Sequence, residues 1–369
     1  MKQALKEIAT IAAGQGAPQG DENYCDNGTP FVKAGNLSEL LAGKPIRDIQ
    51  QVSEEVAHKH RLRLYRKGTV LFAKSGMSCL KGYVYVLPVD AYIVSHLACV
   101  TPNEEVSTYL KYYFTYHRPN QLIKDEAYPS ISLEDIGNLQ IDMKNRSERE
   151  KITSILEGIE AIISLWKQQL QSFDTLIKAR FVELTQTAKT TKTRMGDVAT
   201  YINGYAFKPT DWKEEGLPII RIQNLNDHNA PYNYFPGNLD QKYMVHNGDV
   251  LISWATHLEA YIWNGQDAWV NQHIFRVDFD KMPINKYYFV YSTEEALRQA
   301  FRNAHGFKPT MEHIKRSDFE NAIIDLPAIE VQEQFAHFVQ QIDKSKAVVQ
   351  QALAKDQLLF DSLMQQYFG

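Results

Sequence analysis

The sequence of 369 residues contains an internal repeat, and this repeat constrains the fold more than any other feature. Five short segments of the first half recur in the same order in the second half. The spacing is 190 residues for the first pair, 188 for the second, 180 for the third and fourth, and 183 for the fifth. The paired segments are 5–10 with 195–200, 28–33 with 216–221, 67–72 with 247–252, 128–131 with 308–311, and 138–143 with 321–326. The sequence therefore predicts two copies of one structural unit.

Each copy ends in a long run whose apolar residues are spaced three and four positions apart, over 147–185 and 329–369. This spacing is typical of an amphipathic helix, and about 35 residues span ~50 Å at 1.5 Å per residue. A stripe this long and narrow favours another helix as its partner. We expect the two helices to form an antiparallel coiled coil with a globular module at either end, a pseudo-twofold dumbbell. The alternative is that each helix packs only on its own module.

The two modules, 1–146 and 195–328, have the composition of mixed α/β domains, which makes the fold class α+β. Short apolar runs bounded by turn residues predict strands over 69–73, 82–87, 249–253 and 273–277. Helical spacing follows in each module, over 106–116 and 285–302. A polar linker is expected over 186–194, between the first long helix and the second module.

Composition limits the function. The net charge of −4 excludes binding to nucleic acid through bulk positive charge, so any such binding depends on local patches. No run of about 18 uncharged apolar residues is present and the first residues lack a secretory signal, which predicts a cytoplasmic protein without a membrane span. The three cysteines are widely spaced and predict free thiols rather than disulfides or a zinc site.

The sequence contains no catalytic motif that we recognise. No Walker loop, H-E-x-x-H pattern or deaminase zinc signature is present. The glycines of 14–20 have the wrong spacing for a nucleotide loop, and Pro18 lies where the helix should begin. We therefore expect no cofactor and no metal in this chain.

A local basic patch is the strongest binding signal. The stretch 58–67 is the densest in basic residues, and an extended conformation would place Lys59, Arg61 and Arg63 on one side, where they could follow phosphates. The alternative is a solvated strand edge protected by cations. The matching stretch 241–246 is not basic, which suits two modules that recognise different targets.

Polar side chains fill the other loops that follow predicted strands. Arg221 can pair with guanine, and Gln223 and Asn224 can bond adenine edges. The remaining candidates for DNA contact are their counterparts and the polar or aromatic residues after equivalent strands, namely Lys33, Asn36, Lys74, Ser75, Lys81, Trp254, Thr256, His257 and Lys308. A structural capping role is the alternative for each of them.

Several motifs together carry a resemblance to a known family. The first module opens with L-x-x-I-A at Leu5, continues with P-F-V-K and K-G-T-V-L-F-A-K-S-G, and ends with P-S-I-S-L-E-D-I before a long helix that starts near 148–150. This tandem order resembles the DNA specificity (S) subunit of type I restriction-modification systems over essentially the whole chain. One departure is at 141–146, which lacks the prolines that often precede the helix and that 325–334 retains.

The resemblance implies a non-catalytic subunit whose two target recognition domains bind the halves of a split, asymmetric sequence in double-stranded DNA. It also implies that the long helices dock two methyltransferase (M) subunits, with restriction (R) subunits in the same complex. S-adenosylmethionine (SAM), ATP and Mg²⁺ would then be bound by the partners. Two alternatives stay open: an orphan S-like protein without a cleavage partner, and a coiled-coil adapter with protein-binding or glycan-binding modules.

Overall fold

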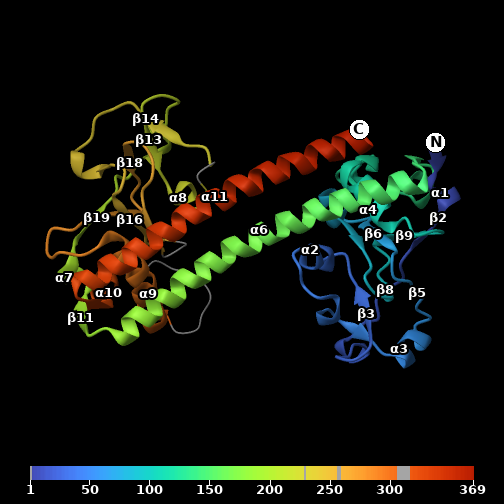
Figure 1. Cartoon of the computed structure of the whole chain (residues 1–369), viewed down its shortest axis with the longest axis horizontal. Coiled ribbons are helices and arrows are strands. Elements are labelled where there is room, and N and C mark those ends of the chain that lie inside the picture. The colour runs from blue at the N-terminus through green and yellow to red at the C-terminus, as the bar shows by residue number, and fades with distance from the viewer. Residues whose placement is uncertain (1, 228–229, 256–258, 306–315) are drawn as a thin grey trace. The chain divides into compact units, whose positions relative to one another are not determined.

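The structure is a computed structural model that describes residues 2–227, 230–255, 259–305 and 316–369 (Figure 1). It divides into two compact units. Unit 1 comprises Met1–Trp166 and Ala352–Gly369, and unit 2 comprises Lys167–Gln351. Both units contain parts of two long helices, and unit 1 is built from two segments far apart in the sequence. Among the described residues, no helix combines the length and apolar character needed to cross a membrane.

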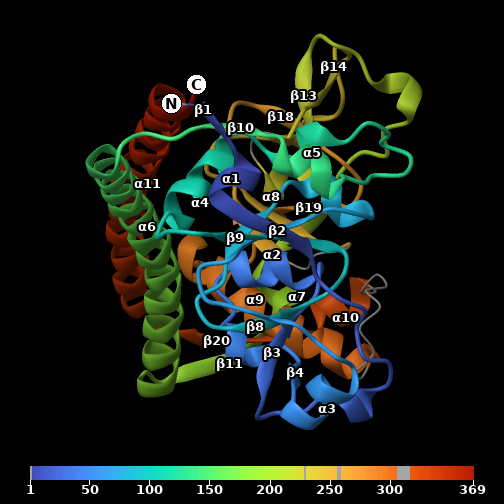
Figure 2. The same cartoon turned by 90° about the vertical axis from the view of Figure 1, so that its right-hand side faces the viewer.

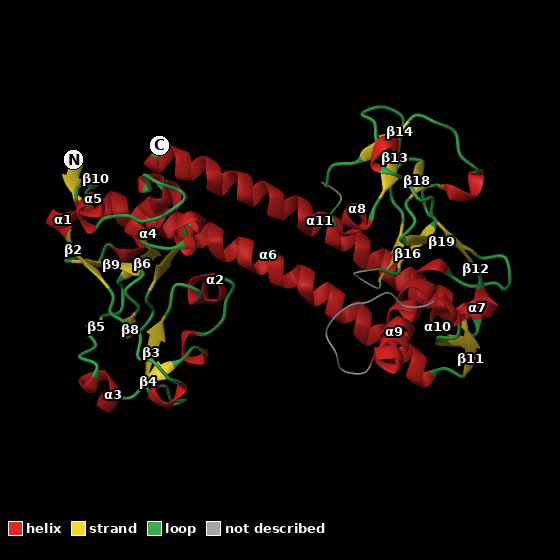
Figure 3. Cartoon of the chain, turned by 180° about the vertical axis from the view of Figure 1, so that it is seen from behind, coloured by secondary structure: helices red, strands yellow, loops and turns green. Residues whose placement is uncertain are grey.

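Unit 1 contains two four-stranded sheets and one strand pair, with strand orders β2-β9-β6-β7, β4-β3-β8-β5 and β1-β10 (Figure 3). All neighbours are antiparallel except β3 and β8, which are parallel. The strands are β1 Lys2–Ala4, β2 Ala9–Ala13, β3 Thr29–Val32, β4 Gln51–Val52, β5 Leu64–Tyr65, β6 Val70–Ala73, β7 Val84–Val86, β8 Ala91–Ile93, β9 Leu97–Pro102 and β10 Gln140–Asp142.

Unit 2 repeats this topology strand for strand, with orders β12-β19-β16-β17, β14-β13-β18-β15 and β11-β20. Here too one neighbouring pair is parallel, β13 with β18, at the position equivalent to β3 and β8. The strands are β11 Thr190–Arg194, β12 Thr200–Asn203, β13 Leu217–Ile220, β14 Asn233–Phe235, β15 Met244–Val245, β16 Val250–Ser253, β17 Glu259–Ile262, β18 Ala268–Val270, β19 Ile274–Asp278 and β20 Ile323–Pro327.

The short helices other than α3 also recur in equivalent places. In unit 1 they are α1 Leu5–Ile8, α2 Asn36–Leu41, α3 Glu54–Lys59, α4 Ser107–Tyr116 and α5 Leu133–Gly137; in unit 2 they are α7 Met195–Val198, α8 Ile222–Asn226, α9 Lys286–His305 and α10 Arg316–Glu320. The two long helices are α6 Arg146–Thr187 and α11 Ile329–Phe368. Short 3-10 helices lie at Asp21–Asn23, Ile46–Asp48, Met77–Lys81, Pro119–Leu122, Pro209–Asp211 and Gln241–Tyr243.

Tyrosines on α4 and α9 tie these helices to the last strand of each module. The Tyr109 hydroxyl donates to the carbonyl oxygen of Asp142 at 2.9 Å, and the Tyr288 hydroxyl donates to that of Asp325 at 2.5 Å. Burial of the phenol, with the Asp142 charge nearby, raises the pKa of Tyr109 to about 12. Each phenol therefore stays protonated and keeps donating throughout the neutral range.

The long helices pair antiparallel within each unit (Figure 2). In unit 1 the Trp166 indole N–H donates to Oδ2 of Asp356 at 2.8 Å, and in unit 2 the Lys346 ammonium lies 2.5 Å from Oδ1 of Asp174. Because α11 residue numbers fall as those on α6 rise, the helices run in opposite directions. The start of one helix and the end of the other lie in each core: Ile152, Leu156, Phe360, Met364 and Phe368 in unit 1, and Phe335, Val339, Ile177 and Leu184 in unit 2.

The fold class predicted from the sequence, two mixed modules with paired long helices, is confirmed. Two local predictions need correction. Thr190–Arg194, inside the expected linker 186–194, forms β11, because its five residues pair in register with Ile323–Pro327. The basic stretch 58–67 is not one extended segment, since its first residues belong to α3. The boundaries of the recognition domains stay a prediction, because the compact units cut through both long helices.

Neighbouring residues of α6 provide a test of how this helix packs in unit 2. Ile177 is fully buried in the core of unit 2, whereas the side chain of Leu176 is 46% exposed. We expect Ile177→Ala to destabilise the protein by about 2–5 kcal/mol, because it leaves a cavity, and Leu176→Ala to cost less than about 1 kcal/mol. Thermal unfolding of the full chain measures both. Equal losses would mean that this face of α6 is not packed as described.

Candidate nucleic-acid interface

In the first module, the ends of several strands meet at the turn 94–96, between β8 and β9. The Val94 N–H donates to the carbonyl oxygen of Val32 at 3.0 Å, which places the end of β3 beside the turn. The Lys74 N–H donates to the carbonyl oxygen of His96 at 2.9 Å, which places the end of β6 there as well. Loops that follow different strands therefore form one surface.

The second module repeats this arrangement around 271–273. The Asn271 N–H donates to the carbonyl oxygen of Ile220 at 3.1 Å, and the Trp254 N–H donates to that of His273 at 3.3 Å. Arg221 and Trp254 thus occupy the positions of Lys33 and Lys74. The candidate residues that the sequence spreads over each module are brought to equivalent places by the backbone.

Two equivalent glycines make this convergence possible. A Cβ atom on Gly14 would lie 2.3 Å from the carbonyl oxygens of Ile93 and Val94, and one on Gly204 would lie 2.2 Å from that of Asn271. Both contacts are with backbone, which cannot move aside as a flexible side chain does. Only glycine lets the strand ends approach the turn this closely.

The basic stretch begins as a helix end rather than a strand. Ser53 caps the start of α3 by accepting the Val56 N–H at 3.3 Å, and His60 and Arg61 end the helix. Arg61 has φ of +52° and its N–H donates to the carbonyl oxygen of His58, as in a left-handed helix cap. The alternation expected for Lys59, Arg61 and Arg63 is therefore wrong, although all three side chains are exposed.

The residues that follow α3 are tied to the converging surface. The Gln15 amide donates to the carbonyl oxygen of Arg61 at 2.7 Å and accepts the N–H of Arg63. The Arg63 guanidinium lies over the Tyr65 ring, 5.2 Å from its centroid. Gln15 follows Gly14 at the turn, so Arg61 and Arg63 lie near it, whereas Lys59 is the last residue of α3.

Lys33 and Arg221 have matching environments. The Lys33 ammonium lies 4.5 Å from the centroid of the Tyr24 ring and donates to Oε1 of Gln50 at 2.6 Å. The Arg221 guanidinium lies 5.0 Å from the Trp212 ring and donates to Oδ1 of Asn233 at 3.0 Å.

Asn36 and Asn224 have structural roles. Their side-chain oxygens accept the backbone N–H groups of Lys33, at 2.8 Å, and of Arg221, at 3.1 Å. Asn224 is also fully buried, and its amide nitrogen donates to the carbonyl oxygens of Ala230 and Pro231. We therefore assign Asn224 to the fold instead of to base recognition. The neighbouring Gln223 is exposed.

The other candidates lie around the same loops. The Ser75 hydroxyl lies 2.8 Å from Nδ1 of His96, and Trp254 packs its ring on His273 at a centroid distance of 5.3 Å. Lys81 is exposed at the end of a 3-10 helix. Thr256, His257 and Lys308 lie outside the described residues.

Sequence reasoning missed the residues that hold the candidate side chains. Tyr24 and Gln50 support Lys33, and Gln15 supports the loop after α3. The repeat contained a signal for the first of these, because Tyr24 and Trp212 are separated by the same 188 residues as Lys33 and Arg221. Among the described residues, no group of three or more acidic, histidine or cysteine side chains could hold a metal ion.

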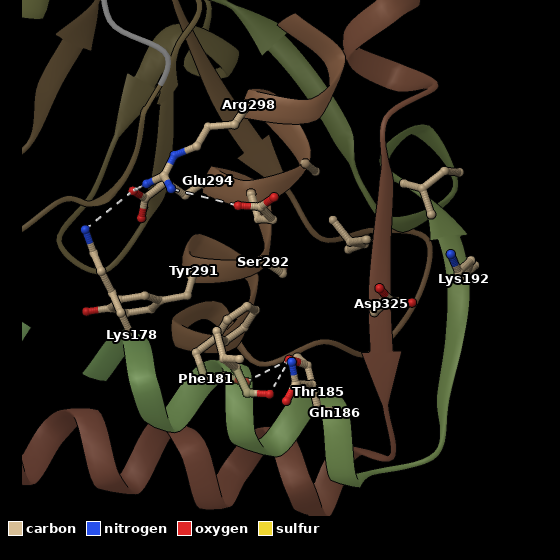
Figure 4. A pocket seen from close by; sticks show the side chains of 15 residues that line it. Lys178, Phe181, Thr185, Gln186, Lys192, Tyr291, Ser292, Glu294, Arg298 and Asp325 are labelled. Atoms are coloured by element: carbon tan, nitrogen blue, oxygen red, sulfur yellow. Dashed lines mark hydrogen bonds and ion pairs between the residues drawn. The ribbon is translucent and has the colours of Figure 1, made fainter. Parts of the chain in front are cut away.

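A hollow of about 540 Å³ in unit 2 lies away from these residues, between the end of α6, α9, β11 and β20 (Figure 4). Phe181, Val182 and Ile323 give it apolar walls. Lys178 and Arg298 both pair with Glu294 at its edge. None of the candidate residues for DNA contact lines it.

The chain matches the family model described as "Type I restriction modification DNA specificity domain" over residues 1–173 and 189–355. It is 26% identical over 163 residues to the type I restriction enzyme EcoBI specificity subunit of Escherichia coli, a match that covers 42% of this chain and 34% of that protein. It is 27% identical over 175 residues to the MjaIX specificity subunit of Methanocaldococcus jannaschii, with 44% and 38% covered. The chain thus spans little more than a third of the length of these curated relatives.

The fold of the whole chain resembles a solved structure. The S subunit of a type I restriction-modification system from M. genitalium has a TM-score of 0.58 with this chain, at 11% identity, with 100% of this chain and 96% of that one covered. At this identity, the likeness shows the fold.

The two glycines near the first turn provide a matched test. Gly14→Ala places a Cβ against two carbonyl oxygens, whereas a Cβ on Gly16 would have no heavy atom within 4 Å. We expect Gly14→Ala to destabilise the protein by about 3 kcal/mol and Gly16→Ala to change the stability by less than about 1 kcal/mol. Thermal unfolding of the full chain measures the difference. An unaltered midpoint for Gly14→Ala would contradict the described convergence of strand ends.

Proposed function

The chain belongs to the family of type I restriction-modification DNA specificity proteins, and we propose that it is the subunit that recognises an asymmetric, bipartite site in double-stranded DNA. The observation that carries the proposal is the repetition of one loop surface, with different side chains at equivalent positions. The first module has Lys33 and Lys74 where the second has Arg221 and Trp254. Two modules with the same backbone arrangement and different side chains at equivalent positions suit the recognition of two different half-sites. The recognition domains proposed are residues 1–146 and 195–328.

In the first module, basic side chains supply affinity. Lys59, Arg61 and Arg63 are exposed, and Arg61 and Arg63 lie beside the converging strand ends. Cations of this kind neutralise phosphates and release counterions, which gives binding that weakens as salt rises. A protein with net charge of −4 needs such a local patch.

Polar and aromatic side chains near the turns supply base recognition. Gln223 is exposed next to Arg221, and Ser75 and Trp254 follow equivalent strands. Amide, guanidinium and hydroxyl groups bond base edges in the major groove, and their identity determines the sequence preferred. Substitution of Gln223 is therefore expected to change the sequence preferred more than the overall affinity.

The chemistry belongs to partner subunits in this proposal. The chain acts as a non-catalytic subunit that directs an adenine-N6 methyltransferase, and R subunits for ATP-dependent DNA cleavage, to the site. SAM, ATP and Mg²⁺ are bound by those partners, and the complex works in the cytoplasm.

Apolar side chains on the long helices suit the docking of two methyltransferase subunits. Val348 and Leu176 in unit 2 are 67% and 46% exposed, and Leu358 and Leu165 in unit 1 are 71% and 62% exposed. Large apolar side chains with this much exposed surface favour contact with another protein. The hollow beside Phe181 adds a concave, partly apolar surface next to α6 (Figure 4).

The salt dependence of DNA binding tests the proposed role of the basic patch. The double variant Lys59→Gln, Arg61→Gly removes two exposed charges, and glycine accepts the positive φ of position 61. We expect weaker binding to all duplexes, with the slope of log K against log salt reduced by about 0.9 for each phosphate that is no longer neutralised. Fluorescence anisotropy with duplex DNA, using the chain bound to its methyltransferase subunits, measures the slope.

Lys44→Gln is the matched control for charge, because Lys44 pairs with Glu39 on the surface of the same module. It should leave the slope unchanged. A double variant with the parental slope would show that the patch does not contact phosphates. Binding by the parental complex that is insensitive to salt would contradict the DNA-binding role and favour the adapter.

A further inference from the structure

Each module holds one cation in a duplicated arrangement of four residues. In the first module the four are Tyr24, Lys33, Asn36 and Gln50. In the second they are Trp212, Arg221, Asn224 and Asn233. The first three pairs are all separated by 188 residues, and the last by 183. Both arrangements use an aromatic ring, a cation, an asparagine and an amide in the same geometric roles.

Two of these contacts hold the cation, and a third holds the backbone of the same residue. The ring attracts the positive charge through its face, and the amide oxygen accepts one of its N–H groups. The asparagine three residues later accepts the backbone N–H of the cationic residue, which sets the direction in which the side chain leaves the strand end. A lysine or arginine held in this way has already lost much of the rotamer freedom that binding would otherwise remove.

The charge of each cation remains uncompensated. Over the described part of the chain, neither Lys33 nor Arg221 pairs with a carboxylate, and both side chains are only half-buried. A guanidinium has five N–H donors and an ammonium has three, so one hydrogen bond to an amide leaves donors available.

Trp212 adds an independent observation. Its indole N–H is buried and has no acceptor among the described residues, whereas the hydroxyl of the equivalent Tyr24 donates to the carbonyl oxygen of Pro18 at 3.0 Å. A buried donor without a partner is unfavourable. The second module accepts this unfavourable group while placing tryptophan, the ring that binds cations best, under its arginine.

We propose that Lys33 and Arg221 are equivalent base-contacting residues, each of which recognises the guanine of one G·C pair in its own half-site. This inference rests on the proposed function and names the residues through which it acts. The major-groove edge of guanine presents two acceptors, O6 and N7, which match the donors left on an oriented cation. Phosphate contacts need no such orientation and suit the exposed side chains of Lys59 and Arg61.

The two rings and the two amides act as positioning residues. Tyr24 and Trp212 hold each cation against a ring face, and Gln50 and Asn233 accept a hydrogen bond from its charged end. Loss of a ring should therefore weaken recognition of the same base without changing which base is preferred. Loss of the cation should change the preference itself.

The test is selection of a randomised duplex DNA library by the full chain bound to its methyltransferase subunits. Arg221→Gln is expected to lower the preference for guanine at one position of one half-site by about 5- to 150-fold, with the other half-site unchanged. Lys33→Gln should do the same in the other half-site only. Trp212→Leu should reduce the preference at the position that Arg221→Gln affects while guanine remains the favoured base.

Controls separate the possible outcomes. Lys44→Gln and Arg194→Gln remove exposed cations that pair with Glu39 and Asp197, and both should leave the selected sequence unchanged. A uniform loss of affinity, with the parental sequence still selected, would assign Lys33 and Arg221 to phosphates and overturn the inference. An unchanged selection would also overturn it. If the parental complex selects no sequence, the proposed function itself fails.

If Arg221→Gln does not fold, Arg221→Lys serves as the second variant. It keeps the charge and loses the two-pronged geometry of the guanidinium. It should lower the preference for guanine at the same single position by a smaller factor. Circular dichroism of each variant establishes that it is folded before selection. A folded Arg221→Lys complex with the parental preference would contradict base contact by the guanidinium.

Discussion

The packing of each module against both long helices is the interaction on which the rest of the structure depends. Phe360, Met364 and Phe368, from the end of the chain, complete the core of the first module. Ile177 and Leu184, from the middle of the chain, complete that of the second. The core of unit 1 combines two segments, Met1–Trp166 and Ala352–Gly369, and that of unit 2 combines parts of both long helices within Lys167–Gln351. The helix pair therefore belongs to the modules themselves and is not merely a connection between them.

The two modules share backbone geometry and differ in the side chains at equivalent positions. Gly14 and Gly204 admit the same close approach of strand ends. The side chains placed there diverge, since Gln15 bonds the backbone of the loop after α3, whereas Tyr205 packs its ring on Tyr243. A scaffold that tolerates such exchange can change what it recognises without changing how it folds.

The sequence predicted the features that depend on periodicity and repetition, including α6, α11 and the matched strands. It failed where tertiary contacts override local pattern. The polar composition of Thr190–Arg194 is typical of a linker, but these residues pair with β20 as a strand. For Asn224 the sequence leaves base recognition and a structural role open, and its hydrogen bonds to the carbonyl oxygens of Ala230 and Pro231 favour the structural role. For the basic stretch the signal was present, since Ser53 followed by two glutamates marks the start of a helix.

The central claim is that this chain determines where a methyltransferase acts on DNA. Genome-wide mapping of methylated adenine in the source strain, with the gene intact and with it deleted, tests this most directly. The account predicts that one split, asymmetric motif loses its methylation when the gene is deleted and that all other motifs keep theirs. An unchanged methylation map would contradict it.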